Sequence, residues 1–591
     1  MRNGPLPLLH IYAYKGMIES IAVLNFAMQL FTSYHLHFST TLTIPLEKMK
    51  FSYHSILLFI HFSALFTNPH ASPSYTIGSS RITKVSLPLF KDSLVSTMEL
   101  LQNVTSTMSQ IHDDDGDDPY LNVTIQHCAN FLGEIAGVLN WTLSSINQEY
   151  TKASSGGYNQ SYTTGDVISH ARTLLNASHG SQETCMEVLN GTKHSMVAGN
   201  LKQVTASIYE IFDMLQMLQG SPDFSKATGA IPIGSTGLDD FKITLKPNVT
   251  VSQDGKGDFK LIMDAIAAAP SHPTKYFVIL VKKGVYKEYV NINNAKSNII
   301  LIGEGKDATI ISGSKSAGGG LATFDTATFA VRAQGFVAID IGFENTAGQH
   351  NAQAVALLSG GDHSVFYRCK ITGNQDTLLV QAGRQFFRDC QITGTVDFIF
   401  GYGTVVFQKC NIYIKKNQIG GTSVIAAHGR NSSTDSSGFS FQFCNIYGDP
   451  KVSAVEPTQQ GAYLGRSWGI YARTVFMQSS ISDVLRPEGW LQRRTDPVDK
   501  LYFGEYQNSG PGAALGGRVK WPGFHKMSAS DAHKFTVANF IDGNSWLASL
   551  GIPYTQGLNP SADPPANPPM AASTSIVTTY KKFISSFYTS D

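Results

Sequence analysis

Short apolar segments recur along the second half of the chain in the pattern F-x-x-C-x-I. Four copies and a fifth variant with serine in place of cysteine begin at Phe366, Phe387, Phe407, Phe441 and Phe476. Repetition of short strand-like segments every 20–35 residues, with little helical periodicity, is typical of a solenoid in which each repeat forms one coil. The pattern therefore predicts a right-handed parallel β-helix over residues 249–558.

Two aspartates occupy the same position in successive repeats. Asp376 and Asp397 each lie ten residues after the phenylalanine of their own repeat. Equivalent positions on adjacent coils are about 4.8 Å apart, so we expect the two carboxyls to be stacked. Counting the same ten residues from Phe343 reaches Gln353, which we expect to lie in this column one coil earlier.

Residues 80–219 have a different pattern, in which apolar residues recur at steps of three and four. This spacing predicts amphipathic helices, and four such segments with short connections predict an up-and-down four-helix bundle. Cys128 and Cys185 fall in different helices and could form a disulfide. One apolar stripe comprises Leu121, Ile125, Cys128, Leu132, Ile135, Leu139, Leu143 and Ile146, and another comprises Leu201, Val204, Ile208, Ile211, Leu215 and Leu218.

The remaining segments predict no packed domain. Residues 220–248 are rich in Gly, Ser and Pro and are predicted to form a linker, and residues 559–591 are predicted to form a disordered Pro-rich tail. Residues 49–72 have a short charged start, an apolar centre and small residues at the end, as in a signal peptide. The apolar centre is short for a membrane span. Residues 1–48 are interpreted as an extension ahead of the true start at Met49, with a long leader or a membrane anchor as the alternative.

Charge and sequons indicate the partner and the compartment. The chain of 591 residues has a net charge of +1, but residues 101–250 carry −8 and residues 251–558 carry +6. A basic second half without an aromatic-basic motif favours an acidic polysaccharide over nucleic acid. Six cysteines are compatible with an oxidising compartment, and seven sequons in the first 250 residues suggest a secreted glycoprotein. The sequons are at Asn103, Asn122, Asn140, Asn159, Asn176, Asn190, Asn248 and Asn431.

Five ordered motifs in residues 249–558 resemble the signatures of plant pectin methylesterases. They are GVYKE from Gly284, QAVAL from Gln353, QDTL from Gln375, GTVDFIFG from Gly394 and YLGRSW from Tyr463. The helical half resembles the inhibitor domain that precedes the enzyme in many family members. The resemblance implies a secreted cell-wall hydrolase that removes methyl esters from pectin, giving pectate and methanol, without a metal or other cofactor. It also implies a possible inhibitor-like partner within the same chain.

The resemblance assigns roles to the two stacked aspartates. Arg466 is placed beside Asp397, which it would keep charged as the nucleophile. Two neighbouring carboxyls do not ionise together easily, so their pKa values should separate. Asp376 would then be the protonated acid and, later, the base that activates water.

The same resemblance supplies the remaining site residues. Gln353 and Gln375 would offer amide N–H groups to the oxyanion. Trp468 is similar to the residue on which the sugar stacks, and Thr323 to a more distant substrate contact. Together with Gln353 and Arg466, these two residues form the expected substrate-binding set.

Three departures from the family pattern leave an alternative open. Asn374 and Leu379 stand where tyrosines are usual, and Ser467 replaces a proline. These positions flank the site, so they bear on activity and substrate fit more than on the type of reaction. The alternative function is a non-catalytic or weakly active pectin-binding or inhibitory protein. A β-helix lyase or glycoside hydrolase is a third hypothesis, but we find neither a calcium carboxylate cluster nor suitably spaced acids.

Two further patterns are interpreted as structural or accidental. Cys369, Cys390, Cys410 and Cys444 share one repeat position and need only form a stack in the core. The segment from Gly465 to Gly469 matches the serine-hydrolase motif G-x-S-x-G, which requires a strand before it and a helix after it. The following residues predict another strand, so the match is rejected.

Overall fold

The computed structural model describes residues 87–109, helical positions between 125 and 143, Cys185, and residues 195–218, 246–273, 275–448 and 461–559. The predicted extension 1–48 and signal segment 49–72 lie outside the described residues. So do most of the predicted linker 220–248 and of the tail 559–591.

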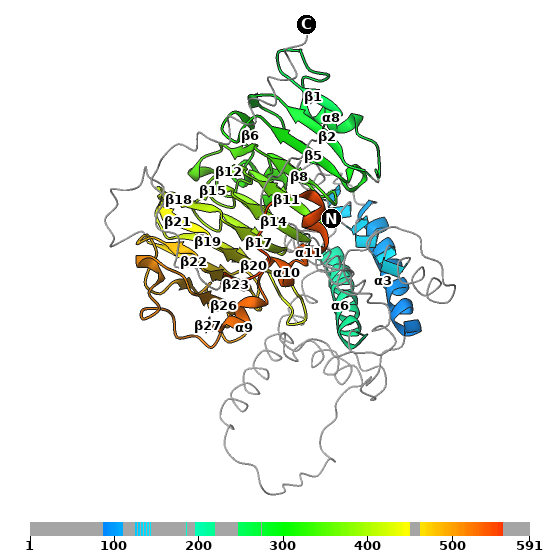
Figure 1. The fold of residues 1–591 in the computed structure, drawn as a ribbon. Coiled ribbons are helices and arrows are strands. Elements are labelled where there is room, and N and C mark those ends of the chain that lie inside the picture. Colours follow the sequence, from blue (N-terminus) through cyan, green and yellow to red (C-terminus); the bar gives the residue numbers. More distant parts are fainter. Residues whose placement is uncertain are drawn as a thin grey trace, which may run out of the picture. The chain divides into compact units, whose positions relative to one another are not determined.

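The strands between Val249 and Lys526 form a parallel β-helix with three sheets (Figure 1). The first sheet contains β1 (Val249–Val251), β2 (Phe277–Val281), β5 (Ile299–Gly303), β8 (Val337–Ile339), β11 (Ser364–Tyr367), β14 (Arg384–Arg388), β17 (Thr404–Gln408), β20 (Gly438–Gln442), β23 (Arg473–Met477), β26 (Tyr502–Tyr506) and β27 (Phe524–Lys526). The second contains β3 (Gly284–Tyr286), β6 (Thr309–Gly313), β9 (Gly342–Asn345), β12 (Lys370–Thr372), β15 (Gln391–Gly394), β18 (Asn411–Ile414), β21 (Asn445–Gly448) and β24 (Ser480–Ile481). The third contains β4 (Val290–Ile292), β7 (Phe329–Val331), β10 (Leu357–Ser359), β13 (Leu378–Val380), β16 (Ile399–Gly401), β19 (Ser423–His428), β22 (Ala462–Ser467) and β25 (Trp490–Leu491). Eight successive coils, from β2 to β25, each contribute one strand to every sheet, and β1, β26 and β27 extend the first sheet alone.

The repeat pattern becomes two columns of side chains inside the coils. The five repeat phenylalanines pair in register from β11 to β23, and successive rings are stacked with centroids 4.3–4.9 Å apart. The repeat cysteines are free and fully buried, which confirms their interpretation as a core stack. The apolar interior of the β-helix is thus built from the residues that define the sequence repeat.

A left-handed residue in each repeat explains the F-x-x-C spacing. The residue before the cysteine, or before Ser479 in the fifth copy, has a positive φ between 48° and 56°. These residues are Arg368, Asp389, Lys409, Phe443 and Gln478. The left-handed conformation turns the chain sharply from the first sheet into the second, although side chains other than glycine disfavour it.

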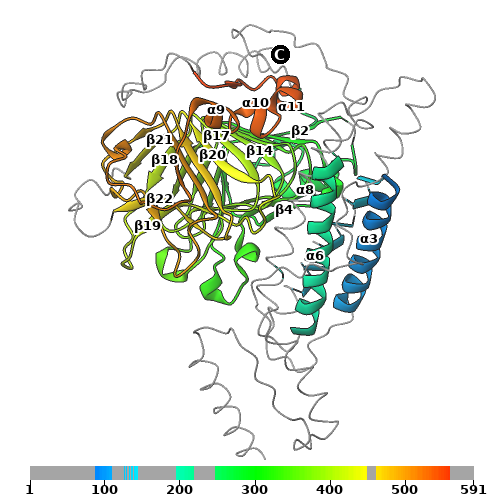
Figure 2. The same ribbon diagram turned by 90° about the horizontal axis from the view of Figure 1, so that it is seen from below.

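Short helices cover one end and one outer face of the β-helix. Helix α8 (Ile262–Ala268) packs against β1, β2 and β4 at the N-terminal end. Helices α9 (Ala529–His533), α10 (Val537–Phe540) and α11 (Gly543–Leu550) follow the last coil. Helices α10 and α11 lie over the first sheet in Figure 2. Their apolar side chains pack on the outer face of that sheet, where Trp546 stacks on His363 at 4.7 Å. Helices α10 and α11 therefore cover the first sheet, whereas a cleft lies on the third sheet.

The part of the helical region that the structure describes contains two long helices. Helix α3 (Leu87–Ser109) and helix α6 (Ser195–Leu218) lie side by side in Figures 1 and 2. The described members of both predicted stripes are mostly buried, and Cys128 forms a disulfide with Cys185, as the sequence allowed. Among the residues that the structure describes, no helix is long and apolar enough to cross a lipid bilayer.

Phe407 offers a test of the ring stack. It is fully buried and contacts the rings of Phe387 and Phe441. We expect Phe407→Ala to lower the free energy of unfolding by about 3–5 kcal/mol, because it removes apolar burial and leaves a cavity between two coils. Urea unfolding measures the change. Phe407→Leu should cost clearly less, and equal losses for the two variants would contradict the packing argument.

Candidate active site

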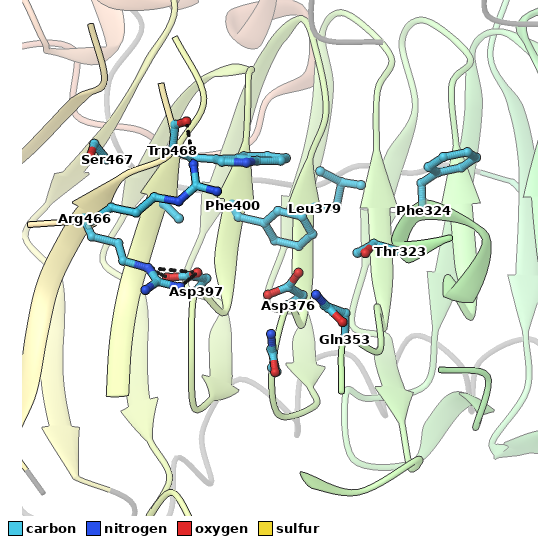
Figure 3. A pocket seen from close by; sticks show the side chains of 13 residues that line it. Thr323, Phe324, Gln353, Asp376, Leu379, Asp397, Phe400, Arg466, Ser467 and Trp468 are labelled. Atoms are coloured by element: carbon cyan, nitrogen blue, oxygen red, sulfur yellow. Dashed lines mark hydrogen bonds and ion pairs between the residues drawn. The ribbon is translucent and has the colours of Figure 1, made fainter. Parts of the chain in front are cut away.

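A cleft of about 340 Å³ lies on the outer side of the third sheet (Figure 3). All seven residues predicted for the site line it. The full lining comprises Thr323, Phe324, Gln353, Gln375, Asp376, Leu379, Asp397, Phe400, Ala427, Arg466, Ser467, Trp468 and Arg493. The structure therefore brings together residues that are up to 170 positions apart in the sequence, although their roles remain predictions.

Asp376 and Asp397 lie in the turns between the second and third sheets. Each is two residues before a strand, and the first residues of those strands, Leu378 and Ile399, are paired in register. Both aspartates are left-handed, with φ values of 59° and 48°, and the Asp376 amide donates to the Val396 carbonyl at 3.1 Å. The predicted stacking of the two aspartates on adjacent coils is confirmed.

Close backbone packing at the start of these turns requires glycine. A Cβ atom on Gly373 would lie 2.7 Å from Thr377 Oγ1, and one on Gly394 would lie 2.2 Å from the Cβ of Phe398. Because the two glycines are equivalent, both turns begin in the same way. Asp376 and Asp397 consequently occupy equivalent positions in the two turns.

Arg466 holds Asp397 by a two-pronged ion pair. Arg466 Nε donates to Asp397 Oδ1 at 2.9 Å, and its Nη2 donates to Oδ2 at 2.5 Å (Figure 3). The side chains are 29% and 15% exposed, so the pair is only partly screened by solvent. Although burial alone would lower it, the pKa of Arg466 is raised because Asp397 accepts its hydrogen bonds. The two hydrogen bonds fix the orientation of the Asp397 carboxyl.

Asp376 has the opposite electrostatic environment. It is 8% exposed, and burial is the main cause that raises its pKa well above the usual range. The neighbouring charge of Asp397 raises that pKa further, while Arg466 opposes the shift. The two carboxyls therefore differ in environment: Asp376 favours the protonated form beside a carboxyl that is held by a guanidinium.

The position predicted for Gln353 in the aspartate column is wrong. Strand register pairs Phe343 with Ile371, whereas Phe366 pairs with Ala338, so the two phenylalanines are not equivalent. The connection from β9 to β10 is longer than in the next coils and contains the short helix Gln349–Asn351. Gln353 nevertheless lines the cleft, where Figure 3 shows its amide beside Asp376.

Aromatic side chains border the cleft on the side of Trp468. The indole lies 5.6 Å from the ring of Phe400 and 4.8 Å from that of Tyr402, measured between centroids. Leu379 pairs in register with Phe400, so the leucine that replaces a usual tyrosine contributes to the cleft floor. An apolar floor beside an aromatic ring suits the face of a sugar.

Ser467 does not have the surroundings of a serine nucleophile. It ends β22, and the next regular element is β23, as the rejection of the serine-hydrolase motif predicted. Its Oγ donates to Asp496 Oδ2 at 3.3 Å. His428, paired with it on β19, is buried and accepts a hydrogen bond at Nδ1 from the Arg473 amide. The histidine is therefore not arranged as a base for this serine.

Arg493 is a cleft residue that the sequence analysis missed. It follows β25, and its Nη1 donates to the Trp468 carbonyl at 3.1 Å. Within the described ranges, we find no group of three or more His, Cys, Asp or Glu side chains that could hold a metal ion. Two carboxyls, two guanidiniums, two amides and two hydroxyls are thus the polar side-chain groups of the cleft.

Comparisons with known proteins identify the family of the chain. The pectinesterase family model matches residues 248–544. The chain is 43% identical over 510 residues to the pectinesterase/pectinesterase inhibitor PPE8B of Prunus persica, with 85% of this chain and 95% of that protein covered. It is 42% identical over 506 residues to the probable pectinesterase/pectinesterase inhibitor 44 of Arabidopsis thaliana, with coverages of 80% and 94%.

A solved structure supports the same assignment. The pectin methylesterase from carrot is 44% identical and matches with a TM-score of 0.53, covering 54% of this chain and 100% of that one. The region matched by the family model contains both aspartates and Arg466, and the fold is a parallel β-helix in which they share one cleft. The chain belongs to the pectinesterase family.

Proposed function

We propose that this pectinesterase removes methyl esters from cell-wall pectin with Asp397 as nucleophile and Asp376 as acid and base. The observation that carries the proposal is the environment of the two carboxyls. Arg466 holds Asp397 through both of its oxygens, while burial and the Asp397 charge favour a proton on Asp376. One cleft thus offers an ionised attacking group and a proton donor.

In the first step, an oxygen of Asp397 attacks the ester carbonyl carbon of a galacturonate unit. The tetrahedral intermediate then expels the methoxy group, which leaves as methanol with the proton of Asp376. The product on the enzyme is an anhydride between Asp397 and the sugar carboxyl. Gln353 and Gln375 are the proposed amide donors to the oxyanion, because both line the cleft and Gln353 lies beside Asp376 (Figure 3).

In the second step, the carboxylate of Asp376 takes a proton from water, and the oxygen of that water attacks the sugar carbonyl of the anhydride. The bond to Asp397 breaks, which restores the carboxylate of Asp397 and the proton on Asp376. A free carboxyl remains on the sugar. Trp468 is the proposed stacking surface for a neighbouring sugar, and Thr323 contacts the chain at the opposite end of the cleft.

The experiment that tests this function is methanol release from methyl-esterified pectin by the purified chain. We expect methanol to appear without reducing ends or unsaturated products. Methanol release would exclude a purely non-catalytic pectin-binding protein, and reducing-end or unsaturated products would reveal a glycoside hydrolase or a lyase. Absence of methanol would overturn the proposed function.

We also propose that the helical region restrains the enzyme and that the chain is secreted to the cell wall. The relatives carry "pectinesterase inhibitor" in their names, and residues 101–250 are acidic where residues 251–558 are basic. Between Lys202 and Thr250 no two basic residues are adjacent, so a protease that cuts at dibasic sites has no obvious target. A tether can give a weakly binding domain an effective concentration in the mM range.

An engineered cleavable linker within residues 220–248 tests the restraint. We expect cleavage to raise the rate of methanol release, with a larger gain at low salt, because salt weakens attraction between oppositely charged surfaces. The uncut chain and an equally treated chain with the native linker are the controls. An unchanged rate at both salt concentrations would refute the restraint.

A further inference from the structure

We propose that two buried side chains, those of Asn345 and Thr326, position Gln353 for the reaction. The inference rests on the proposed function, in which the Gln353 amide donates a hydrogen bond to the oxyanion. Neither Asn345 nor Thr326 lines the cleft, and neither belongs to the five motifs that indicated the site. Both would therefore act on the reaction only through the residues that they hold.

Gln353 lies in a segment whose place the repeat of the β-helix does not fix. The connection from β9 to β10 is longer than in the next coils and contains the short helix Gln349–Asn351. Ala352, directly before Gln353, has φ of 58° and ψ of −144°, a conformation that residues other than glycine disfavour. Such a conformation persists only where the surrounding structure holds it. The position of Gln353 thus depends on contacts that the coil repeat does not supply.

Asn345 supplies one of these contacts from the end of β9, where it is 4% exposed. Its Nδ2 donates to the carbonyls of Lys315 at 2.9 Å, Thr326 at 3.3 Å and Val355 at 3.1 Å. Its Oδ1 accepts from the Ala347 N–H at 3.0 Å. Both ends of the amide are therefore used, and an aspartate here would place an oxygen against three carbonyl oxygens.

Thr326 holds the other side of the same residue, Val355. The Thr326 hydroxyl is buried, accepts from the Val355 N–H at 3.0 Å and donates to the Thr323 carbonyl at 2.6 Å. Val355 is thus bound by side chains at both its N–H and its carbonyl, two positions after Gln353. Because Thr323 and Gln353 both line the cleft, the two buried side chains join two separate segments of its lining.

This support should matter most in the transition state. A donor to the oxyanion is effective only where its N–H meets the developing charge, and a displacement of about 1 Å can lower the rate about 10²-fold. Loss of the Asn345 amide would free the Val355 segment to shift, which would move Gln353 relative to Asp376. We expect the effect in kcat and not in KM, because the aromatic border around Trp468 is untouched.

Asn345→Ala and Thr326→Val test the inference, with Thr328→Val as the matched control. Thr328 is also fully buried, but its hydroxyl donates to the Glu344 carbonyl at 3.0 Å and not to Val355. On methyl-esterified pectin, we expect each of the first two variants to lower kcat about 10-fold with KM within about 3-fold. Thr328→Val removes a buried hydrogen bond as well, yet it should leave kcat within about 2-fold. An equal loss of kcat in Thr328→Val would attribute the effect to lost stability.

A double-mutant cycle with Gln353→Ala separates positioning from a merely structural role. If Asn345 acts through Gln353, adding Asn345→Ala to Gln353→Ala should lower kcat by less than about 2-fold. The same loss of about 10-fold in both backgrounds would overturn the inference. Thr326→Val keeps the shape of its side chain, so it carries the same cycle if urea unfolding shows that Asn345→Ala is not folded.

The outcomes also distinguish this inference from the proposed function. A slow Gln353→Ala variant beside fully active Asn345→Ala and Thr326→Val variants would refute the positioning alone. Full activity of Gln353→Ala would refute both its oxyanion role and the positioning, while methanol release by the unmodified chain would still support the esterase. Absence of methanol release by that chain would overturn the proposed function itself.

Discussion

Asp397→Asn should lower methanol release by about 10³-fold or more, because the amide cannot form the anhydride that is the proposed intermediate of both steps. The substitution keeps the side-chain volume, so the fold should persist. Rates on methyl-esterified pectin, measured beside circular dichroism spectra of both proteins, give the comparison. A variant that keeps more than about a tenth of the activity would show that Asp397 is not the nucleophile.

Asp340→Asn is the matched control for this experiment. Asp340 is also left-handed, with φ of 57°, and accepts two hydrogen bonds from the guanidinium of Arg368. It lies outside the cleft. Its replacement breaks a similar aspartate–arginine pair, so it should cost stability and leave kcat nearly unchanged. If Asp340→Asn lost as much activity, the effect of Asp397→Asn would have to be explained by a broken ion pair and not by the loss of a nucleophile.

Asp376→Asn should lower methanol release by about 10²- to 10⁴-fold, since Asp376 is the proposed donor of the proton to methanol and the proposed base that later activates water. In the unmodified enzyme, the first step needs the protonated form of Asp376, whose pKa is raised by burial and by Asp397. Activity should therefore fall as the pH rises through that pKa. Steady-state rates between pH 4 and 9 give the profile. A variant with nearly full activity would exclude Asp376 as the acid and base.

The same variant should be more stable than the unmodified chain at neutral pH. A carboxyl whose pKa is raised by folding adds stability below its unfolded pKa of about 3.9, and that contribution is lost as the pH rises through the folded pKa. Asparagine does not titrate. We expect Asp376→Asn to increase the free energy of unfolding at pH 7 by about 0.5–3 kcal/mol, the usual size of single-residue effects. This gain should shrink towards pH 4. Urea unfolding of both proteins at pH 7 and at pH 4 measures it, and a gain that is the same or larger at pH 4 would contradict the prediction.

The repeat pattern was sufficient to predict the β-helix because the same residues define the sequence repeat and fill the core. Phe387 and Cys390, for example, are fully buried, and Phe387 pairs in register with the repeat phenylalanines of the coils before and after it. The phase of Asp376 and Asp397 could be counted for the same reason, since the turns before β13 and β16 are short and nearly equal in length. Where coil length is regular, sequence separation translates directly into spatial stacking.

The two misplaced or missed residues lie where that regularity ends. Gln353 follows a longer connection, so a count of ten from Phe343 no longer marked an equivalent position. Arg493 follows the two-residue strand Trp490–Leu491, which has no repeat motif to fix its phase. Its place in the cleft depends on a hydrogen bond to the Trp468 carbonyl, and a backbone acceptor leaves no signal in the sequence.

The stacked turns separate the chemistry of this enzyme from its choice of substrate. Backbone pairing between adjacent coils sets the stacked positions of Asp376 and Asp397, and Arg466 fixes the Asp397 carboxyl by two hydrogen bonds. Residues at the cleft border, such as Arg493, lie outside this pairing, so we expect that they can be replaced without moving the two aspartates. Directed evolution of this enzyme could accordingly confine its mutations to the border and obtain new patterns of de-esterification from one unchanged reaction.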